Sequence, residues 1–384
     1  MPSIESLGHD IVYKVKRLSP STGSERKHIR GEFRALEGMQ KEGIIHYRPT
    51  GTVWRMACDE GPYLNGTDLS SFPLGFYSAG ITFDFMEQIL AQAKAKNVDV
   101  KTLELSLDHI YTMEGSAIRG DMIGGAKPIE IKVKLETDAD AKTAKDIVDL
   151  ARESSVGQSI MRDVMTNVFA LSLNGEHLPV TSLTASHEPL RAEPETVFEK
   201  AHPAEGHYDA EIIKKLTDTE AVFGVEGGAG SSLQAEQKRS LHVRSEASLR
   251  EDGLKETKIQ LFKPLGSTFR FLSDVDTDQG GEARAPNGVS YLAAGVGFCY
   301  MTQIGRYAHI KKQKLHRYKV IQDLWFGHEG DSAKVEPVDT HTYVHMDEGE
   351  SEAQQLLKMS EQTCFLHAAM RSAYPSNVTV EALD

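Results

Sequence analysis

The hydrophobic positions of the chain follow two different spacings. Between about residue 74 and residue 96 apolar side chains recur near helical spacing, at Phe76, Ile81, Phe85, Ile89 and Ala93. The flanking segments HIRGEFRAL, GTVWRMAC, LELSLDHIY and IEIKVKLE are strand-like, and the last two alternate apolar and polar residues. A second helix is expected from about residue 141 to residue 162, before the strand NVFALSL. This order of strands and helices predicts an α+β fold.

The same order recurs in the second half of the chain. The sequence matches itself at an offset of 215 residues, which pairs Gly51 with Gly266 and FYSAGITFDFMEQILAQA with YLAAGVGFCYMTQIGRYA. Towards the C-terminal ends of the two copies the offset is 210, which places Ser154 opposite Cys364. We therefore predict two tandem domains, residues 1–185 and 216–384, related by a pseudo-twofold axis and joined by a linker at residues 186–215.

Two segments between the copies carry little chemistry. The linker is rich in Pro and Glu and is followed by AEIIKKL, where we expect a short helix. The glycine-rich stretch GVEGGAGSS at residues 224–232 lacks the Lys-Ser/Thr ending of a phosphate-binding loop, and no apolar strand leads into it. We expect a mobile loop there.

Composition and charge exclude several kinds of partner. A formal net charge of −13 argues against a nucleic-acid partner, and the basic stretch Lys311 to Lys319 is typical of a solvated helix end. The apolar runs are too short to span a bilayer, and the N-terminal segment has no signal-peptide core. We expect a cytoplasmic protein without a membrane partner.

The chain has three cysteines, Cys58, Cys299 and Cys364. They are too few for a disulfide scaffold and lack zinc-site spacing, and the histidines form no ligand motif, so we predict no metal and no cofactor. Cys299 lies on the first long helix of the second copy and Cys364 opens its second helix, so stacking of these helices would bring the thiols together. The first copy has Asp84 and Ser154 at these places and is expected to be redox-silent, with Cys58 an ordinary core or edge residue.

The segments YLAAGVGFC, ending at Cys299, and SEQTC, ending at Cys364, resemble the OsmC/Ohr family of thiol-dependent peroxidases. The resemblance implies antiparallel sheets wrapped around long central helices, here as an internal pseudo-dimer that further association would enlarge. It also implies that Cys299 attacks an organic hydroperoxide, that Cys364 resolves the sulfenic acid to a disulfide, and that an external dithiol reduces both.

The resemblance further implies an arginine that keeps the attacking thiol ionised. Counting back from the turn glycine Gly253 gives Arg244, and Arg30 of the first copy lies one place out of that register. A surface-strand role is the alternative for each. The family glutamate is absent, because Val289 stands in its place, and Glu282 is the one substitute nearby.

Other residues near the cysteines have two interpretations. His367, one turn after Cys364, would either share a proton with a thiol or simply pack in the core. Four apolar residues would either line a pocket for an organic hydroperoxide or belong to the plain core: Tyr300, Met301, Tyr307 and Trp325.

Three functions follow from this pattern. The first is reduction of organic hydroperoxides through the Cys299/Cys364 pair. The second is a non-catalytic or redox-sensing module on the same fold that binds an apolar small molecule, which the missing glutamate and the thiol-free first copy favour. The third is a structural duplicate in which both cysteines are inert.

Overall fold

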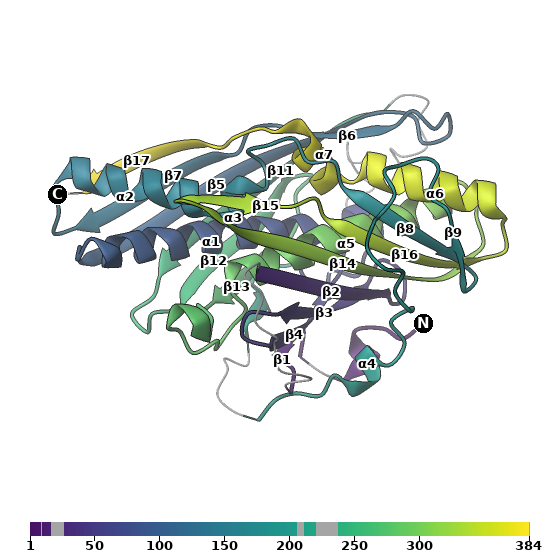
Figure 1. The fold of residues 1–384 in the computed structure, drawn as a ribbon, viewed down its shortest axis with the longest axis horizontal. Coiled ribbons are helices and arrows are strands. Elements are labelled where there is room, and N and C mark those ends of the chain that lie inside the picture. The colour runs from purple at the N-terminus through teal and green to yellow at the C-terminus, as the bar shows by residue number, and fades with distance from the viewer. Residues whose placement is uncertain (9, 17–26, 206–210, 220–236, 384) are drawn as a thin grey trace.

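The computed structural model describes residues 1–8, 10–16, 27–205, 211–219 and 237–383. Within these residues the fold consists of two largely antiparallel sheets around long helices (Figure 1). The predicted α+β class is therefore confirmed. The glycine-rich stretch at residues 224–232 lies outside the described residues.

Sheet 1 combines strands from both halves of the chain. In spatial order it holds β1 (Val12–Lys14), β4 (Thr52–Cys58), β3 (Lys41–Tyr47), β2 (Lys27–Ala35), β14 (Leu315–Glu329), β16 (Asp339–Met346), β8 (Val168–Leu173) and β9 (Glu176–Leu178), with β15 (Ser332–Val335) paired to β14. The junctions between the halves are the antiparallel pair β2–β14 and the parallel pair β16–β8.

Sheet 2 repeats this plan with the halves exchanged. Its order is β10 (Ile213–Lys215), β13 (Thr268–Ser273), β12 (Lys255–Lys263), β11 (Gln237–Leu249), β5 (Val100–Gly115), β7 (Glu130–Thr137) and β17 (Asn377–Leu383), with β6 (Ile123–Ala126) paired to β5. Here the junctions are β11–β5, antiparallel, and β17–β7, parallel. Each half thus supplies strands to the sheet of the other.

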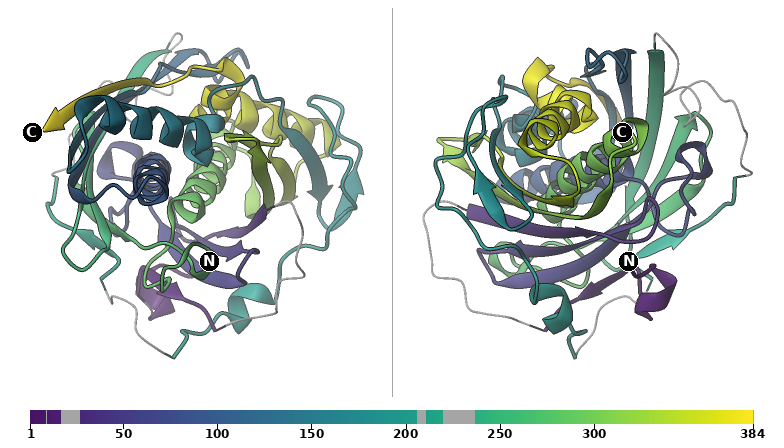
Figure 2. Two further views of the ribbon diagram at one scale, coloured as in Figure 1. Left: turned by 60° about the vertical axis from the view of Figure 1, so that its left-hand side comes forward. Right: turned by 90° about the vertical axis from the view of Figure 1, so that its right-hand side faces the viewer.

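The helices also correspond in the two halves. The long helices α1 (Pro73–Ala95) and α5 (Gly288–Ile310) lie side by side in the middle of the molecule, with strands around them (Figure 2). The helices α2 (Ala141–Ser154) and α3 (Val156–Ser159) match α6 (Glu350–Thr363) and α7 (Phe365–Ser372). The single helix predicted for residues 141–162 is therefore interrupted, because Ser155 adopts an extended conformation and caps α3 with its side chain.

The structure corrects the register near the C-terminal ends. The helices α2 and α6 are both 14 residues long and begin 209 positions apart, not 210. The difference arises in one hairpin: Gly115 and Gly330 still correspond, but the connection from Gly115 to β6 is longer than the turn between β14 and β15. Ser155, and not Ser154, is consequently the counterpart of Cys364.

The segment between the halves packs against sheet 1. Arg191 pairs with Asp323 at 2.8 Å, and the hydroxyl of Tyr343 donates to the carbonyl of Arg191 at 2.9 Å. A short helix, α4 (Val197–Lys200), follows. The helix expected at AEIIKKL is wrong: Ile212 and Ile213 are buried, and β10 forms as an edge strand beside β13 because this pairing outweighs a weak local preference.

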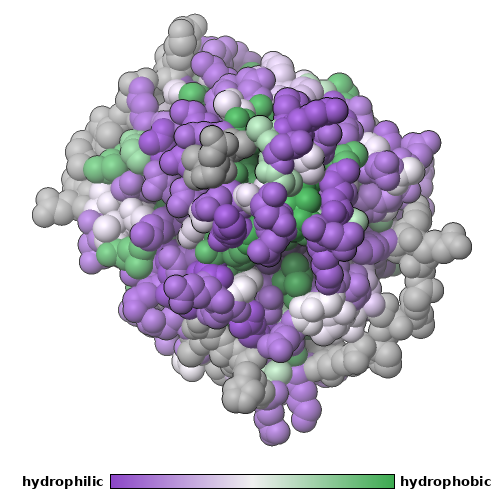
Figure 3. All heavy atoms as spheres, turned by 90° about the vertical axis from the view of Figure 1, so that its left-hand side faces the viewer, coloured by the Kyte–Doolittle hydropathy of each residue, from purple (hydrophilic) through white to green (hydrophobic). Residues whose placement is uncertain are grey.

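One hydrophobic cluster extends through both halves and includes residues of α1, α5 and the inner faces of both sheets. The end of the molecule near α2 and β17 is mostly hydrophilic, with hydrophobic residues in small separate groups (Figure 3). None of the helices in the described part of the chain has both the length and the hydropathy needed to cross a bilayer.

The contact between α1 and α5 depends on two glycines. A Cβ at Gly80 would lie 2.4 Å from the backbone nitrogen of Leu292, and a Cβ at Gly295 would lie 2.6 Å from that of Tyr77. Gly80 and Gly295 are 215 positions apart, as are Tyr77 and Leu292. The two contacts are therefore equivalent under the same offset, and neither position has room for a side chain.

We predict that Gly80→Ala and Gly295→Ala each lower the free energy of unfolding by about 1–3 kcal/mol, because overpacking at a backbone contact outweighs the gain in helix propensity. Gly327→Ala is the control, since a Cβ there meets no atom within 4 Å. Urea unfolding of the three variants measures the effect. Unchanged or increased stability of both helix variants would contradict the assignment.

Candidate functional site

Cys299 and Cys364 lie together in the interior. Cys299 is on α5, and Cys364 lies between α6 and α7 with extended backbone angles, at the N-cap position of α7 but without a side-chain capping hydrogen bond. Their Sγ atoms are 3.4 Å apart, both cysteines are unbridged, and their exposed fractions are 2% and 0%. A disulfide between them requires the sulfur atoms to approach by a little over 1 Å, to about 2.05 Å.

The two thiols differ in acidity. Burial, and then the hydrogen bond with Cys364, raises the pKa of Cys299. Burial would also raise the pKa of Cys364, but the hydrogen bond with Cys299 and the nearby His367 together lower it. The amide N–H of His367, in the first turn of α7, acts in the same direction, as expected at a helix N-terminus. Cys364 is therefore the more acidic member of the pair.

Aromatic side chains enclose the thiols. Tyr77 of α1 and Tyr111 of β5 are fully buried, and their pKa values are raised first by burial and then by the cysteines, among other groups. The ring of Tyr111 lies 5.6 Å from that of Phe365, the residue after Cys364. Tyr77 and Tyr111 come from the first half of the chain, so the site lies between the halves.

The β5–β6 hairpin of the first half covers the turn that holds Cys364. A Cβ at Gly124 of β6 would lie 3.1 Å from the carbonyl oxygen of Thr363 and 3.5 Å from that of Cys364. The side chain of Gln362 donates to the carbonyl of Met122 at 2.8 Å. The hairpin that is longer than its counterpart is therefore the one beside the thiols.

Arg30 and Arg244 hold the junctions between the halves. Arg30 Nε and His28 Nε2 lie 2.8 Å and 2.6 Å from Asp323 across the β2–β14 pair. Arg244 and His242 contact Asp108 at the same distances across the β11–β5 pair. Both arginines project from the sheet face opposite to the buried residues of their strands. These ion pairs do not support the predicted role in thiol activation.

A different set of charged groups lies near Cys299. Glu60, on the loop after β4, is 3% exposed and accepts hydrogen bonds from Thr302 Oγ1 at 2.7 Å and Tyr63 Oη at 2.9 Å. Burial lowers the pKa of Arg306, and Glu60, Tyr63 and Cys299 oppose this shift. Burial, and then Arg306, lowers the pKa of Arg239 to about 9. The buried carboxylate of Glu60, the buried Arg239 and the half-buried Arg306 thus lie on this side of the site.

The spacing of Arg239 and Arg306 in the sequence agrees with their positions near Cys299. Arg239 has the same strand phase as the buried Leu241 and Val243, whereas Arg244 has the opposite phase. Arg306 lies seven residues after Cys299, two helical turns along the same face of α5. Glu60 had no such signal, since it belongs to the other half. The substitute proposed from the sequence, Glu282, is 80% exposed and lies near Arg284.

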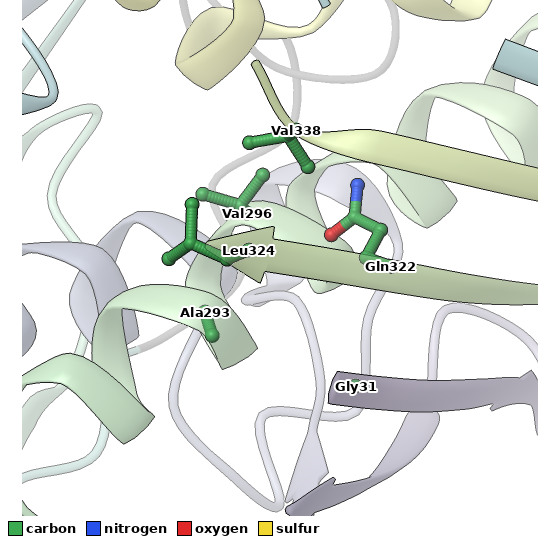
Figure 4. Close-up of a pocket in the computed structure, with 6 residues that line it drawn as sticks. All are labelled: Gly31, Ala293, Val296, Gln322, Leu324 and Val338. Carbon is green, nitrogen blue, oxygen red and sulfur yellow. The ribbon is translucent and has the colours of Figure 1, made fainter. Parts of the chain in front are cut away.

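The four candidate pocket residues do not lie together. Tyr300, Met301 and Tyr307 belong to the main core, whereas Trp325 stacks on His28 at 4.8 Å beside the Arg30 ion pair. A cavity of about 10 Å³ does lie beside α5 (Figure 4), and it has room for about one water molecule. Its lining contains neither cysteine: Gly31, Ala293, Val296, Gln322, Leu324 and Val338.

The corresponding place in the first half holds a carboxylate. Asp84 accepts hydrogen bonds from Ser155 Oγ and from the amide of Gly157, at 2.8 Å for the latter. Asp84 and Ser155 are the counterparts of Cys299 and Cys364, so one polar pair replaces the other. Cys58, the remaining cysteine, is fully buried, and burial raises its pKa.

One turn further along α1, Glu87 lies buried beside Lys255. Its Oε1 lies 3.4 Å from Lys255 Nζ and accepts from the amide of Gly288 at 3.2 Å. Burial raises the pKa of Glu87 to about 7, although Lys255 lowers it. In the described part of the chain, no three His, Cys, Asp or Glu side chains come together as metal ligands would.

We predict that Arg30→Met and Arg244→Met leave the oxidation rate of the thiols unchanged. Arg30→Met should lower the free energy of unfolding by about 1–3 kcal/mol, because Asp323 is fully buried. Arg244→Met should cost less than about 1 kcal/mol, because Arg244 is 38% exposed. Urea unfolding and peroxide-dependent thiol loss measure the two effects, and slower oxidation in either variant would restore its predicted activating role.

The raised pKa of Glu87 predicts that the stability of the protein depends on pH. Because its pKa is about 7 in the folded state and near 4.5 when unfolded, the folded protein retains a proton between these values. Its contribution to stability is therefore fully present below about pH 4.5 and is lost as the pH rises through about 7. Relative to Glu87→Gln, the wild type should lose stability between about pH 5 and pH 8. Glu104 is exposed, so the Glu104→Gln variant should show the same change of stability with pH as the wild type. A stability difference between the wild type and Glu87→Gln that does not change with pH would contradict the prediction.

Comparison with known proteins gives two matches. Residues 280–379, which contain both cysteines, match the family model described as OsmC-like protein. A crystal structure of an OsmC-like hydroperoxide resistance protein from Jannaschia sp. CCS1 is 21% identical, with 33% of this chain and 83% of that chain covered and a TM-score of 0.19. No curated protein matches the chain. The likeness to OsmC-like proteins thus covers residues 280–379, the part of the chain that carries both cysteines.

Proposed function

We propose that this protein reduces organic hydroperoxides through Cys299 and Cys364. The observation that carries the proposal is the pair of unbridged Sγ atoms 3.4 Å apart inside an OsmC-like segment. At this separation a small movement closes a disulfide, and the surrounding helices hold the two sulfur atoms in place. Three unbridged cysteines also suit a reducing compartment such as the cytoplasm.

The proposed reaction uses two thiols and one hydroperoxide. A thiolate of the pair attacks the terminal oxygen of the hydroperoxide, the O–O bond breaks, and an alcohol leaves once its oxygen has gained a proton. The sulfenic acid then condenses with the other thiol, which forms the disulfide and releases water. An external dithiol reduces the disulfide by exchange, so each cycle consumes one hydroperoxide and oxidises one dithiol.

The surroundings of the pair favour an organic substrate. Tyr77, Tyr111 and Phe365 present apolar surface around the sulfur atoms, and all three are buried. Such surface gains free energy by contact with an alkyl group and gains nothing from hydrogen peroxide.

We further propose that the chain is a tandem duplication in which only the second half retains the thiols. The matching strand and helix order and the equivalent glycine contacts support it. In this assembly the first half contributes Glu60, Tyr77 and the β5–β6 hairpin to the site. Asp84 and Ser155 cannot form a sulfenic acid, which leaves one redox site in the chain.

A redox-sensing role is the second candidate. It is favoured by the burial of the two cysteines, whose exposed fractions are 2% and 0%. Burial slows the access of any oxidant to the thiols. A sensor would form the same disulfide without sustained turnover.

We expect steady consumption of tert-butyl hydroperoxide with dithiothreitol as reductant, faster than that of hydrogen peroxide. Cys299→Ser and Cys364→Ser should reduce turnover to the rate without protein, whereas Cys58→Ser, the matched control, should retain it. Mass spectrometry of the oxidised protein should show one disulfide, between the Cys299 and Cys364 peptides. Disulfide formation without turnover would favour the sensor, and absence of both would contradict either redox function.

A further inference from the structure

A cluster of basic side chains lies on the outer face of sheet 1, the face turned away from the long helices. Asp323, Arg30 and His46 stand in one row across the pairs β14–β2 and β2–β3. His28, two residues before Arg30, contacts the Asp323 carboxylate at 2.6 Å. Arg48 follows β3, and its amide donates to the carbonyl of His28 at 3.0 Å. The cluster thus combines neighbouring residues of three strands.

The linker between the halves adds a further guanidinium group to this cluster. Arg191 lies over Asp323, 2.8 Å from its carboxylate, and its second contact, with the exposed Glu188, is longer at 3.9 Å. Farther along the linker, Phe198 shares a small hydrophobic cluster with Ile44 of β3. The linker therefore contacts sheet 1 at both β14 and β3, on either side of β2.

The charge of Arg48 has no counterion in the cluster. Arg30 and Arg191 both bind the carboxylate of Asp323, whereas the Arg48 side chain forms neither a hydrogen bond nor an ion pair with any described residue. Burial raises the pKa of Glu32, the other carboxyl group nearby, although Arg30 and Arg48 oppose this shift. Burial, and then Arg30, lowers the pKa of Arg48. An anion beside Arg48 would relieve both effects on its guanidinium.

The remaining acidic groups of this face have partners of their own. Asp339 of β16 lies 3.4 Å from His341. Glu193 of the linker lies 2.8 Å from His345 and 3.1 Å from Lys319. These contacts are on β16 and farther along β14, so they do not supply the missing counterion at the end of β3.

Two buried nitrogen atoms of the cluster also lack partners. Nε2 of His46, a residue that is 7% exposed, and Nε of Arg191 have no hydrogen bond to a described residue. Burial, and then Arg48 and Arg30, lowers the pKa of His46 to about 3, so its ring is neutral at pH 7 and can donate one hydrogen bond. Unpaired buried donors are costly. A negatively charged hydrogen-bond acceptor would satisfy both donors and the guanidinium of Arg48.

The outer face of sheet 2 is an internal comparison, because it repeats the ion pair without the additional basic groups. His242 and Arg244 contact Asp108 at 2.6 Å and 2.8 Å. Gln260 stands opposite Arg244 in the β11–β12 pair, the place that a histidine occupies on sheet 1. Phe262, two residues farther along, lies 5.1 Å from the Arg244 guanidinium, where sheet 1 has an arginine. The ion pair therefore does not need the extra histidine and arginines.

We propose that the outer face of sheet 1 binds a phosphate group between Arg48, Arg191 and His46. Guanidinium groups match the oxygen atoms of phosphate in geometry and charge. The three donors come from β3, the turn after it and the linker, an arrangement that suits a tetrahedral oxyanion better than a planar carboxylate. Arg48 is half-buried and Arg191 is 21% exposed, so an ion from solvent can reach them. This inference is independent of the proposed hydroperoxide reduction.

Titration calorimetry with inorganic phosphate at pH 7 and constant ionic strength tests the site. We expect one saturable site per chain with a Kd below about 1 mM. Arg48→Met should weaken binding at least tenfold. Arg250→Met is the control, because it also removes one guanidinium group, but from an ion pair with Asp252 beside sheet 2. Its Kd should change less than twofold. Absence of saturable binding, or an equal loss of affinity in both variants, overturns the proposal.

Thermal unfolding provides a second readout that includes a check on folding. Because Arg48 forms no side-chain bond with a described residue, Arg48→Met should unfold at the wild-type temperature without phosphate. Added phosphate should raise the unfolding temperature of the wild type, since a ligand that binds only the folded state stabilises it. An equal rise in Arg48→Met overturns the assignment of the site.

Competing anions identify the ligand. Acetate and glycerol 3-phosphate are titrated at the same ionic strength as inorganic phosphate. Acetate that binds as tightly as phosphate overturns the phosphate assignment. Tighter binding of glycerol 3-phosphate supports a site for phosphate monoesters, and tighter binding of inorganic phosphate supports a site for the free ion.

Discussion

Direct backbone contact between α1 and α5 at Gly80 and Gly295 determines where both polar centres lie. A side chain at either glycine would separate the helices, since the nearest backbone nitrogens are 2.4 Å and 2.6 Å from the Cβ positions. The close approach places Tyr77 of α1 beside the thiols of the second half, and it places Gly288 of α5 against Glu87 of α1. The sheets are then completed by strands exchanged between the halves, so that neither half has a separate core.

The same position of the fold supports opposite chemistry in the two halves. Around Cys299 and Cys364 the hydrogen bond between the thiols and the N-terminal turn of α7 favour one thiolate. Around Asp84 a serine hydroxyl and an amide satisfy a carboxylate that burial would otherwise make costly. Both arrangements use the N-terminus of a short helix after an interrupted long one. The fold thus provides hydrogen-bond donors at this position, and the residues present decide whether the group that they contact can react.

Much of the architecture could be predicted from the sequence, because apolar periodicity and the 215-residue offset are local signals. The long helices, the strands around them and the cysteine-bearing elements follow from these patterns. An ungapped comparison places the offset near Cys364 one residue out, because it cannot locate a length difference within a hairpin loop. The local sequence of β10 predicts a helix, because the pairing with β13 that makes it a strand is a long-range contact.

The charged residues of the site were harder to predict. Counting from a turn glycine selects Arg244, with Arg30 one place out of register, and ignores the strand alternation that points both side chains away from the helices. Glu60 comes from a loop of the other half, and only the folded structure brings it to Thr302. Residues that reach a site across an interface leave no spacing in the sequence.

The covalent connection between the halves has a genetic consequence. In a symmetric homodimer of identical chains, one codon specifies the same position in both sites, so a mutation that removes a thiol removes it twice. In this chain each site is encoded separately. Substitutions at Cys299 and Cys364 can therefore be made without altering Asp84 and Ser155.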